Sequence, residues 1–276
     1  MDAKDLLKTW PDWQRAGAET ILASPAWRLP ARLGAESSGE LTVTADLPDD
    51  PIVLSVTLDG EAHTLVLGDA AAYPDLHLLW KRRAGLPAEV LLALIEKECG
   101  DLFSLIENVM RRQFALKGLA DSVPAELRVF LFTCGETALR FGLDLTPALV
   151  TQLGTLDALD PAHPSIRALT RPYRAVEGRI ALAEDEQSAL VPGAYVLLPE
   201  SFDAERRWAT EDELAASEGA LAVACGTTEI SFGAVADGTF PEIPPLGEVE
   251  ILLRGSRVAR AAVTQVGDVT GLLVKA

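Results

Sequence analysis

Apolar and polar side chains alternate along the chain from Glu40 to Gly68. The runs LTVTADL and PIVLSVTL have a period of two, and HTLVLGD continues it after the dipeptide Asp59-Gly60. This period is typical of strands with one buried face, and Asp-Gly is a strong hairpin signal. The segment therefore predicts a β-meander.

The pattern becomes helical after Leu86-Pro87 and stays so to about Phe114. Apolar residues spaced by three and four form one broad stripe for burial. They include Val90, Leu91, Leu94, Ile95, Leu102, Leu105, Ile106 and Val109. Gly100 is expected to bend or divide this helix.

Strand-like runs return between residues 114 and 145, as FALKGL, LRVFLFTC and TALRFGLDL, with a turn at Gly135-Glu136. Thr146-Pro147 is a good helix start, and it predicts a short helix to Leu156. The prolines that flank His163 then predict a linker. We place the domain boundary near Asp160–Arg171.

Residues 1–30 hold three of the five tryptophans and three prolines. The pattern from Asp12 to Leu22 predicts one amphipathic helix. Two interpretations remain open: this segment packs on the main domain, or it is a detachable arm that binds a partner.

The part after the linker is rich in predicted strands. A polar helical turn at Glu184–Leu190 and a Pro192-Gly193 turn separate the first two strands, 203–218 is a loop or solvated helix, and Pro241, Pro244 and Pro245 form a spacer. The chain ends in a three-stranded meander with turns at Arg254-Gly255-Ser256 and Gly267-Asp268. The predicted strands are Val176–Leu182, Ala194–Leu198, Ala220–Ala224, Glu229–Val235, Val249–Leu253, Val258–Val263 and a last one ending at Val274.

Together these patterns predict an α+β fold. Its parts are an N-terminal helical arm (1–30), a mixed domain of β-meanders around a long helix (31–160), a linker (161–171) and a β-rich C-terminal region (172–276).

Charge narrows the possible partners. Acidic residues outnumber basic ones by 41 to 24, so the formal charge is −17. Such a surface repels nucleic acid and anionic lipid. It serves solubility, or it attracts a partner with a basic face. No apolar run approaches the roughly 18 residues that span a bilayer, and the first residues do not resemble a signal peptide. We expect a cytoplasmic protein, and its three separate cysteines fit a reduced compartment.

Residues with catalytic or metal-binding chemistry are few and scattered. His63, His77 and His163 have no second ligand at metal-site spacing. The acidic runs Glu184–Glu186 and Glu211–Glu213 lie in polar segments, where carboxylates normally face water.

The remaining candidates are also weak. The glycines form no phosphate-binding loop, Ser37-Ser38 has no strand-to-helix elbow, and Lys81-Arg82-Arg83 is a solvated segment end. We therefore expect no catalytic residue, cofactor or metal, and no enzyme. Two alternatives remain open: an α+β enzyme of unrecognised type, and a binding adaptor.

Two blocks of the C-terminal region resemble a known module. VEGRIALAEDEQSALVPGAYVLLP (176–199) resembles the opening half of the SPOA module of the flagellar switch proteins FliM and FliN and of the SctQ/YscQ/HrcQ proteins of type III secretion. Gly178-Arg179 and Pro192-Gly193 stand at matching positions, while Ala194 replaces a frequent aspartate.

The terminal block VEILLRGSRVARAAVTQVGDVTGLLV (249–274) resembles the closing half of the same module. Its matching points are Val249-Glu250-Ile251, Arg254-Gly255, Val258-Ala259-Arg260 and Gly271. The N-terminal region is similar in outline to the upstream domain of the SctQ proteins. Those proteins usually carry two complete modules, whereas here either the second is shortened or one module contains an insertion after Pro199.

The resemblance implies a non-enzymatic scaffold of the type III secretion sorting platform, related to the flagellar C-ring. It would be cytoplasmic and peripherally associated with an inner-membrane secretion complex. Its partners would be a SPOA-containing protein or a second copy, the ATPase stator, a membrane-proximal adaptor and chaperone–effector complexes, without nucleic acid or membrane insertion.

In that family SPOA modules pair through interlocking strands, which suggests which residues pair here. We expect blocks 176–199 and 249–274 to fold together and Ile251→Asp to break the pairing. Val258 and Val263 have opposite parity, so they cannot share a face of one straight strand. The predicted pairing residues are Val249, Ile251, Leu253, Val258, Val263, Ile180, Val196 and Leu198.

Overall fold

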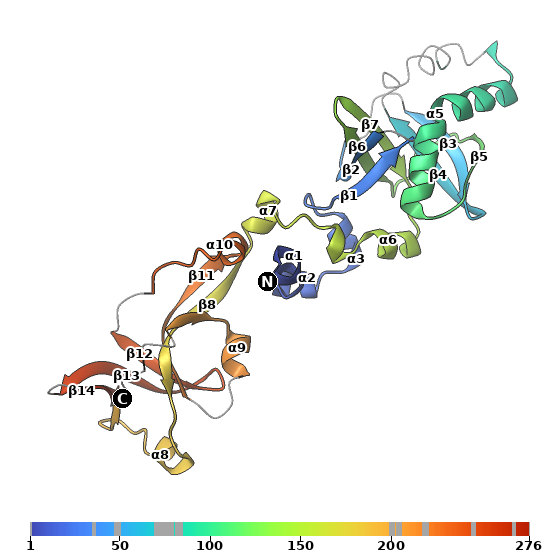
Figure 1. The fold of residues 1–276 in the computed structure, drawn as a ribbon. Helices are drawn as coiled ribbons and strands as arrows, with labels where there is room; N and C mark the ends of the chain where they lie inside the picture. Colours follow the sequence, from blue (N-terminus) through green and yellow to red (C-terminus); the bar gives the residue numbers. More distant parts are fainter. Residues whose placement is uncertain are drawn as a thin grey trace. The chain divides into compact units, whose positions relative to one another are not determined.

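The computed structural model describes residues 2–34, 37–46, 51–68, 80, 85–198, 202, 206–216, 221–243, 247–266 and 269–275. His77, Lys81-Arg82-Arg83 and the predicted Gly267-Asp268 turn lie outside these residues. The chain divides into two compact units, Met1–Ser165 (unit 1) and Ile166–Ala276 (unit 2) (Figure 1). Each unit contains helices and an antiparallel sheet, so the fold is α+β, as predicted.

Unit 1 is built on a seven-stranded sheet in the order β1-β2-β6-β7-β4-β3-β5. Asp59 and Gly60 both have positive φ, as a two-residue hairpin turn requires, and they join β3 to β4. The strands are β1 (Leu29–Leu33), β2 (Ser37–Thr44), β3 (Ile52–Leu58), β4 (Glu61–Gly68), β5 (Phe114–Leu119), β6 (Arg128–Cys134) and β7 (Thr137–Leu143).

The predicted meander over 40–68 is correct in its strands and wrong in its pairing. Among β2, β3 and β4, only β3 and β4 pair with each other as a hairpin. β2 pairs with β1 on one side and β6 on the other, so both of its ladders are occupied away from β3. Alternation reveals a strand, but distant partners decide its neighbours.

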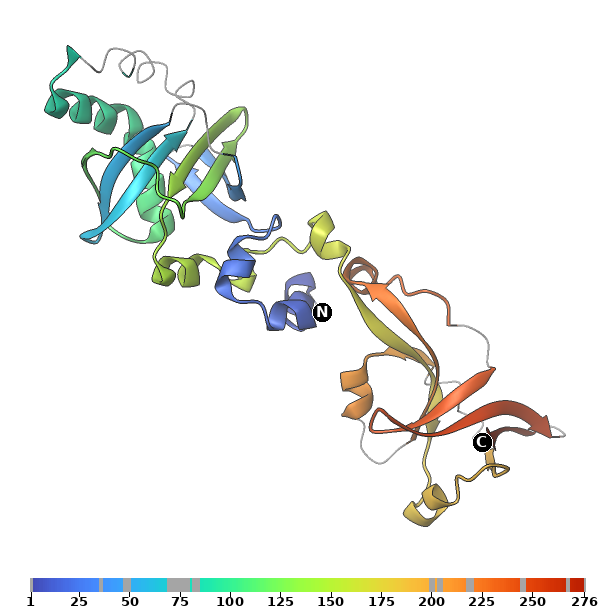
Figure 2. The ribbon, with the colours of Figure 1, turned by 180° about the vertical axis from the view of Figure 1, so that it is seen from behind.

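The predicted long helix is α5 (Ala88–Met110), which packs against β5 and β1. Figures 1 and 2 show that α5 changes direction part-way along, as Gly100 near its middle led us to expect. Its predicted apolar stripe is largely buried, but Val90 in the first turn is exposed.

The single helix predicted from Asp12 to Leu22 is wrong. Gly17 has extended backbone and separates two short helices, and a third precedes them. Trp27 is fully buried, and its Nε1 donates to the Leu153 carbonyl at 2.9 Å. These contacts fit the interpretation that the segment packs on the main domain. The helices are α1 (Ala3–Lys8), α2 (Pro11–Gln14) and α3 (Ala18–Leu22), and they precede α6 (Pro147–Leu153) and η3 (Leu156–Ala158) in unit 1.

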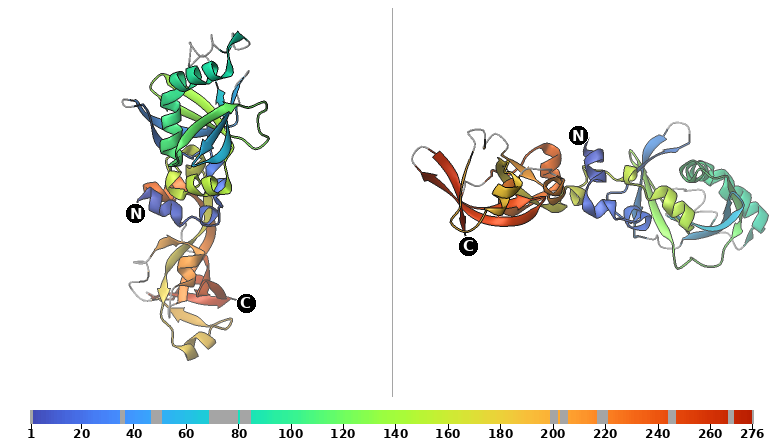
Figure 3. Two further views of the ribbon diagram at one scale, coloured as in Figure 1. Left: turned by 90° about the vertical axis from the view of Figure 1, so that its right-hand side faces the viewer. Right: turned by 90° about the horizontal axis from the view of Figure 1, so that it is seen from below.

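Unit 2 also has a seven-stranded antiparallel sheet, in the order β10-β8-β11-β12-β13-β14-β9. Its strands twist and curve strongly (Figure 3). They are β8 (Thr170–Ile180), β9 (Tyr195–Leu197), β10 (Arg207–Ala209), β11 (Leu221–Ser231), β12 (Glu248–Leu253), β13 (Ser256–Val266) and β14 (Val269–Lys275). The helices are α7 (Pro164–Arg167), α8 (Glu184–Ser188), α9 (Glu211–Ala215) and α10 (Phe232–Asp237).

The strand predicted at Glu229–Val235 is wrong. One continuous strand, β11, ends at Ser231, and helix α10 begins at the next residue. The Ser231 side chain accepts a hydrogen bond from the Ala234 backbone N–H at 3.2 Å and so caps this helix. The predicted terminal meander is present as β12-β13-β14, with Arg254 and Gly255 at positive φ in its first turn.

Candidate interaction surface

The predicted pairing residues mostly gather in one place. Seven of the eight belong to, or pack against, a single hydrophobic cluster in unit 2. Its buried members are Phe202 and residues of β8, β11, β12, β13 and β14, and Val196 of β9 packs against them. Since β9 also pairs with β14, blocks 176–199 and 249–274 share one sheet and one core.

Val258 is the exception. Ile251 pairs with Ala259 and the next residue, Leu252, pairs with Arg257, so Val258 is the extra residue of a β-bulge. It is 46% exposed and lies outside the cluster. Val263, of opposite parity, packs against the cluster.

The core members of this set are internal to the chain. Ile251 is 0% exposed, and Val249 and Ile180 are also buried. No partner can reach them while unit 2 stays closed. They hold together the sheet whose surface and edges face outward.

The segment between the two blocks completes this sheet. β11 lies between β8 and β12 and pairs with both. Phe202 packs directly over Gly178, where a Cβ would come within 2.4 Å of the Phe202 carbonyl oxygen. This close approach requires glycine at the Gly178-Arg179 motif. Trp208 Nε1 donates to the Pro241 carbonyl at 2.8 Å, which joins the two ends of the segment.

A buried carboxylate lies beside this contact. Glu177 is fully buried; Arg206 Nε approaches its Oε2 at 2.8 Å, and Cys225 Sγ donates to Oε1 at 3.1 Å. Burial, helped by this hydrogen bond and the carboxylate charge, raises the pKa of Cys225 to about 12. Burial likewise raises the pKa of Cys99 to about 12. Both thiols are therefore protonated near neutral pH and are poor nucleophiles.

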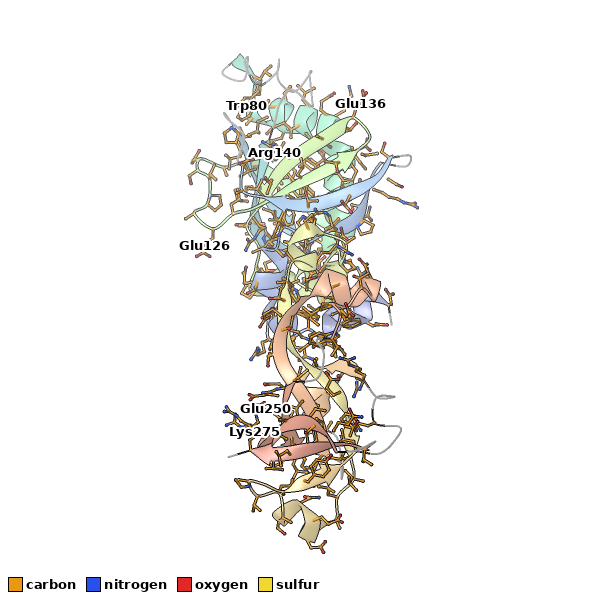
Figure 4. All side chains as sticks on the ribbon, turned by 90° about the vertical axis from the view of Figure 1, so that its left-hand side faces the viewer. Trp80, Glu126, Glu136, Arg140, Glu250 and Lys275 are labelled. Atoms are coloured by element: carbon orange, nitrogen blue, oxygen red, sulfur yellow. The ribbon has the colours of Figure 1, made fainter. Side chains whose placement is uncertain are left out.

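The outward face of β12, β13 and β14 carries a network of ion pairs. Glu250 bonds Arg174 at 2.6 Å and Arg257 at 3.0 Å, and Lys275 bonds Glu248 at 2.5 Å. Figure 4 shows Glu250 and Lys275 on this face. The hydrogen bond from Arg257 is the main cause that lowers the pKa of Glu250, and that from Lys275 lowers the pKa of Glu248.

These carboxylates are tied into ion pairs and ionised. A general acid that acts near neutral pH needs a raised pKa instead. The open groove beside them, with a volume of about 660 Å³, is therefore lined by matched charges that hold β8 and β12–β14 together.

The described histidines have structural partners. His63 is buried, with Nδ1 2.9 Å from the Asp144 carbonyl oxygen, and His163 Nδ1 lies 2.7 Å from Ser165 Oγ. Within the described ranges no three His, Cys, Asp or Glu residues are grouped as a metal site would need. None of the helices in those ranges is long and apolar enough to cross a membrane.

An exposed apolar patch lies on β9 and β14. The predicted pairing residues include Val196 and Leu198, which pack against the core, but not the alternate residues of the same strand. The available signal was the run VPGAYVLL (191–198), which has no charged residue on either face. We call Tyr195, Leu197, Val269 and Leu273 the β9 patch.

Comparison with solved structures finds FliM chains of H. pylori. A chain from the crystal structure of a FliM–SpeE complex has a TM-score of 0.29 and 11% identity, with 44% of this chain and 82% of that chain covered. The FliM middle domain has a TM-score of 0.28 and 12% identity, with 56% and 90% covered. No family model and no curated protein matches the chain.

Proposed function

We propose that this chain is a non-enzymatic scaffold that assembles with other proteins through unit 2. The observation that carries the proposal is the union of two SPOA-like blocks, 176–199 and 249–274, in one sheet and one hydrophobic core. Motif resemblance in two separate segments has more weight when the segments fold together. The protonated thiols and paired carboxylates described above favour binding over chemistry.

We further propose that unit 2 is one SPOA-like module with an insertion, rather than one module and part of a second. The inserted segment contributes β10 and β11 to the same sheet, and β11 pairs with the first strands of both blocks. A second module would be expected to bring its own core, whereas the second hydrophobic cluster of unit 2 joins Leu214 of this segment to Val176 and Leu252 of the two blocks. Here Phe202, Leu221 and Val223 from the insertion belong to the shared cluster.

The finer proposal is a role in the type III secretion sorting platform. The scaffold would link a membrane-proximal adaptor to the ATPase stator, receive chaperone–effector complexes, and be cytoplasmic at an inner-membrane complex. Support comes from the positions of Gly178-Arg179 and Pro192-Gly193. Gly178 accommodates Phe202, and Gly193 has φ +90°, which favours glycine at the turn into β9.

Affinity purification of the tagged full chain from its native cells, with quantitative mass spectrometry, tests this role. Recovery of a secretion-type ATPase, its stator and a small adaptor is the expected result. A soluble chain that recovers none of these would contradict the secretion role and leave a binding adaptor unrelated to secretion.

A further inference from the structure

The four sheet edges of the molecule differ in how they are protected. Natural edge strands avoid pairing with other chains through charges, prolines or bulges. β1 carries Pro30 and Arg32, β5 carries Lys117, and β10 carries Arg207. β9 carries none of these, and no charged residue occurs from Val191 to Leu198.

The backbone of β9 has hydrogen-bonding groups directed outward. Val274 N–H donates to the Ala194 carbonyl at 2.9 Å, and Leu198 N–H donates to the Thr270 carbonyl at 3.2 Å. In an antiparallel ladder, the backbone hydrogen-bonding groups of successive residues point alternately to the two sides of the strand. Ala194, Val196 and Leu198 direct theirs toward β14, so the residues between them direct theirs away from it. The N–H and C=O groups of Tyr195 and Leu197 therefore face the open edge.

The side chains of the same residues are apolar and exposed. Tyr195 is 36%, Leu197 64%, Val269 46% and Leu273 41% exposed. Tyr195 lies opposite Leu273 and Leu197 lies opposite Gly271, which puts them on one face. A Cβ on Gly271 would come within 2.4 Å of the Tyr195 ring, so this ring lies flat against β14. The patch is thus preformed.

We propose that β9 pairs antiparallel with β9 of a second copy of this chain. A twofold axis at Val196 places Tyr195 of one copy opposite Leu197 of the other. Both are outward-bonding residues, so each such pair exchanges two backbone hydrogen bonds. The two β9 patches then meet on one face of a continuous sheet.

Two observations favour a second copy as the occupant. The outward groups are symmetric about Val196, which suits an isologous contact. The chain also carries a net charge of −17, which disfavours contact between two copies, and the uncharged β9 edge adds no like charges at the contact itself. A basic partner would instead be drawn to the acidic surface. The patch is small beside the roughly 800 Å² per partner of a standard interface, so the dimer is weak.

The salt dependence of the contact distinguishes a second copy from a basic partner. Screening weakens the repulsion between two acidic copies, so raising NaCl from about 50 to about 500 mM strengthens self-association. Salt would weaken a contact with a basic partner. The inference does not depend on the secretion role, because it concerns the chain alone.

Sedimentation velocity of the purified full chain over a concentration series is the test. The expected result is a monomer–dimer equilibrium that salt strengthens. Leu197→Lys and, separately, Leu273→Lys should weaken the dimer by about tenfold or more. Both put a charge into the apolar patch that the contact buries, and Leu197→Lys also puts like charges at diagonal positions of the two β9 strands. Val258→Lys, at an exposed position outside the patch, is the matched control and should change little.

Circular dichroism of each variant establishes that it is folded. A wild-type chain that stays monomeric at both salt concentrations would overturn the proposal. So would a dimer that both patch variants leave intact, because the contact would then lie elsewhere. Loss of the dimer in Val258→Lys as strongly as in the patch variants would also overturn it.

Discussion

The sheets of the two units have the same number of strands but are covered differently. In unit 1, the 23-residue helix α5 packs against β5 and β1. In unit 2, the described helices have only four to six residues, and curved strands enclose the core with help from Phe202 and Trp208. Covering by one long helix buries apolar surface within a unit.

The same contrast extends to the edges. Both edges of the unit 1 sheet carry a basic residue, and β1 also has a proline. Unit 2 has one edge with Arg207 and one neutral edge at β9. Equal strand numbers therefore do not make the two sheets alike, because the charge of an edge strand governs whether it can pair with another chain. Four substitutions test these differences, and the first has the largest expected effect.

Ile251→Asp should unfold unit 2 and leave unit 1 folded. A carboxylate at this fully buried position has no partner, so the loss is about 4 kcal/mol or more. Hydrogen–deuterium exchange would show protection lost in peptides from residues 166–276 alone. Val258→Asp is the control, and its exposed bulge position predicts a change within about 0.5 kcal/mol. Equal destabilisation by both variants would contradict the assigned core.

Trp27→Ala should destabilise unit 1 by about 3–5 kcal/mol, because it removes a fully buried ring and its hydrogen bond to Leu153. Urea unfolding monitored by circular dichroism would measure the loss. If residues 1–30 were a detachable arm, the stability of unit 1 would not change. This variant therefore decides between the two interpretations of that segment.

Gly178→Ala should cost about 1–3 kcal/mol, because the new methyl group collides with the backbone of Phe202. Gly118 in β5 is the matched control in unit 1, since a Cβ there meets nothing within 4 Å. Thermal unfolding of both variants compares them. A Gly178→Ala chain as stable as Gly118→Ala would remove the structural reason for the Gly178-Arg179 motif.

Glu250→Gln should cost about 0.5 kcal/mol at neutral pH, since this ion pair is partly exposed. The pKa of Glu250 is lowered in the folded chain, so its stabilising effect is complete above the ordinary glutamate pKa of about 4.3 and disappears as the pH falls through the lowered folded value. Urea titrations from pH 7 to pH 3 should show the two chains converging in acid. A difference that grows as the pH falls would have the wrong sign.

Local signals accounted for much of the fold. The Asp59-Gly60 hairpin, helix α5 and the terminal meander each depend on a turn dipeptide or a period within one segment. The strand predicted at Glu229–Val235 failed because its apolar spacing also suits a helix, and the Ser231 cap decides for the helix. The pairing of β2 failed because its partners β1 and β6 are set by tertiary contacts.

The same division between local sequence signals and tertiary contacts applies to the candidate interaction surface. Apolar alternation selected Ile251, which is buried, and Val196, which packs against the same cluster. It could not show that this core is closed within the chain, because strand β11 and Phe202 come from a segment that no local pattern connects to the blocks. It also passed over Leu197, since exposure on a strand depends on which neighbours cover each face.

The most direct test of the neutral edge is hydrogen–deuterium exchange of the full chain in dilute and concentrated solution. If β9 pairs between copies, the peptide covering 191–198 gains protection at high concentration, because the Tyr195 and Leu197 amides become bonded between copies. Peptides covering β1, β5 and β10 should show no gain. Concentration-dependent protection at one of those charged edges, or no gain at 191–198, would contradict this pairing.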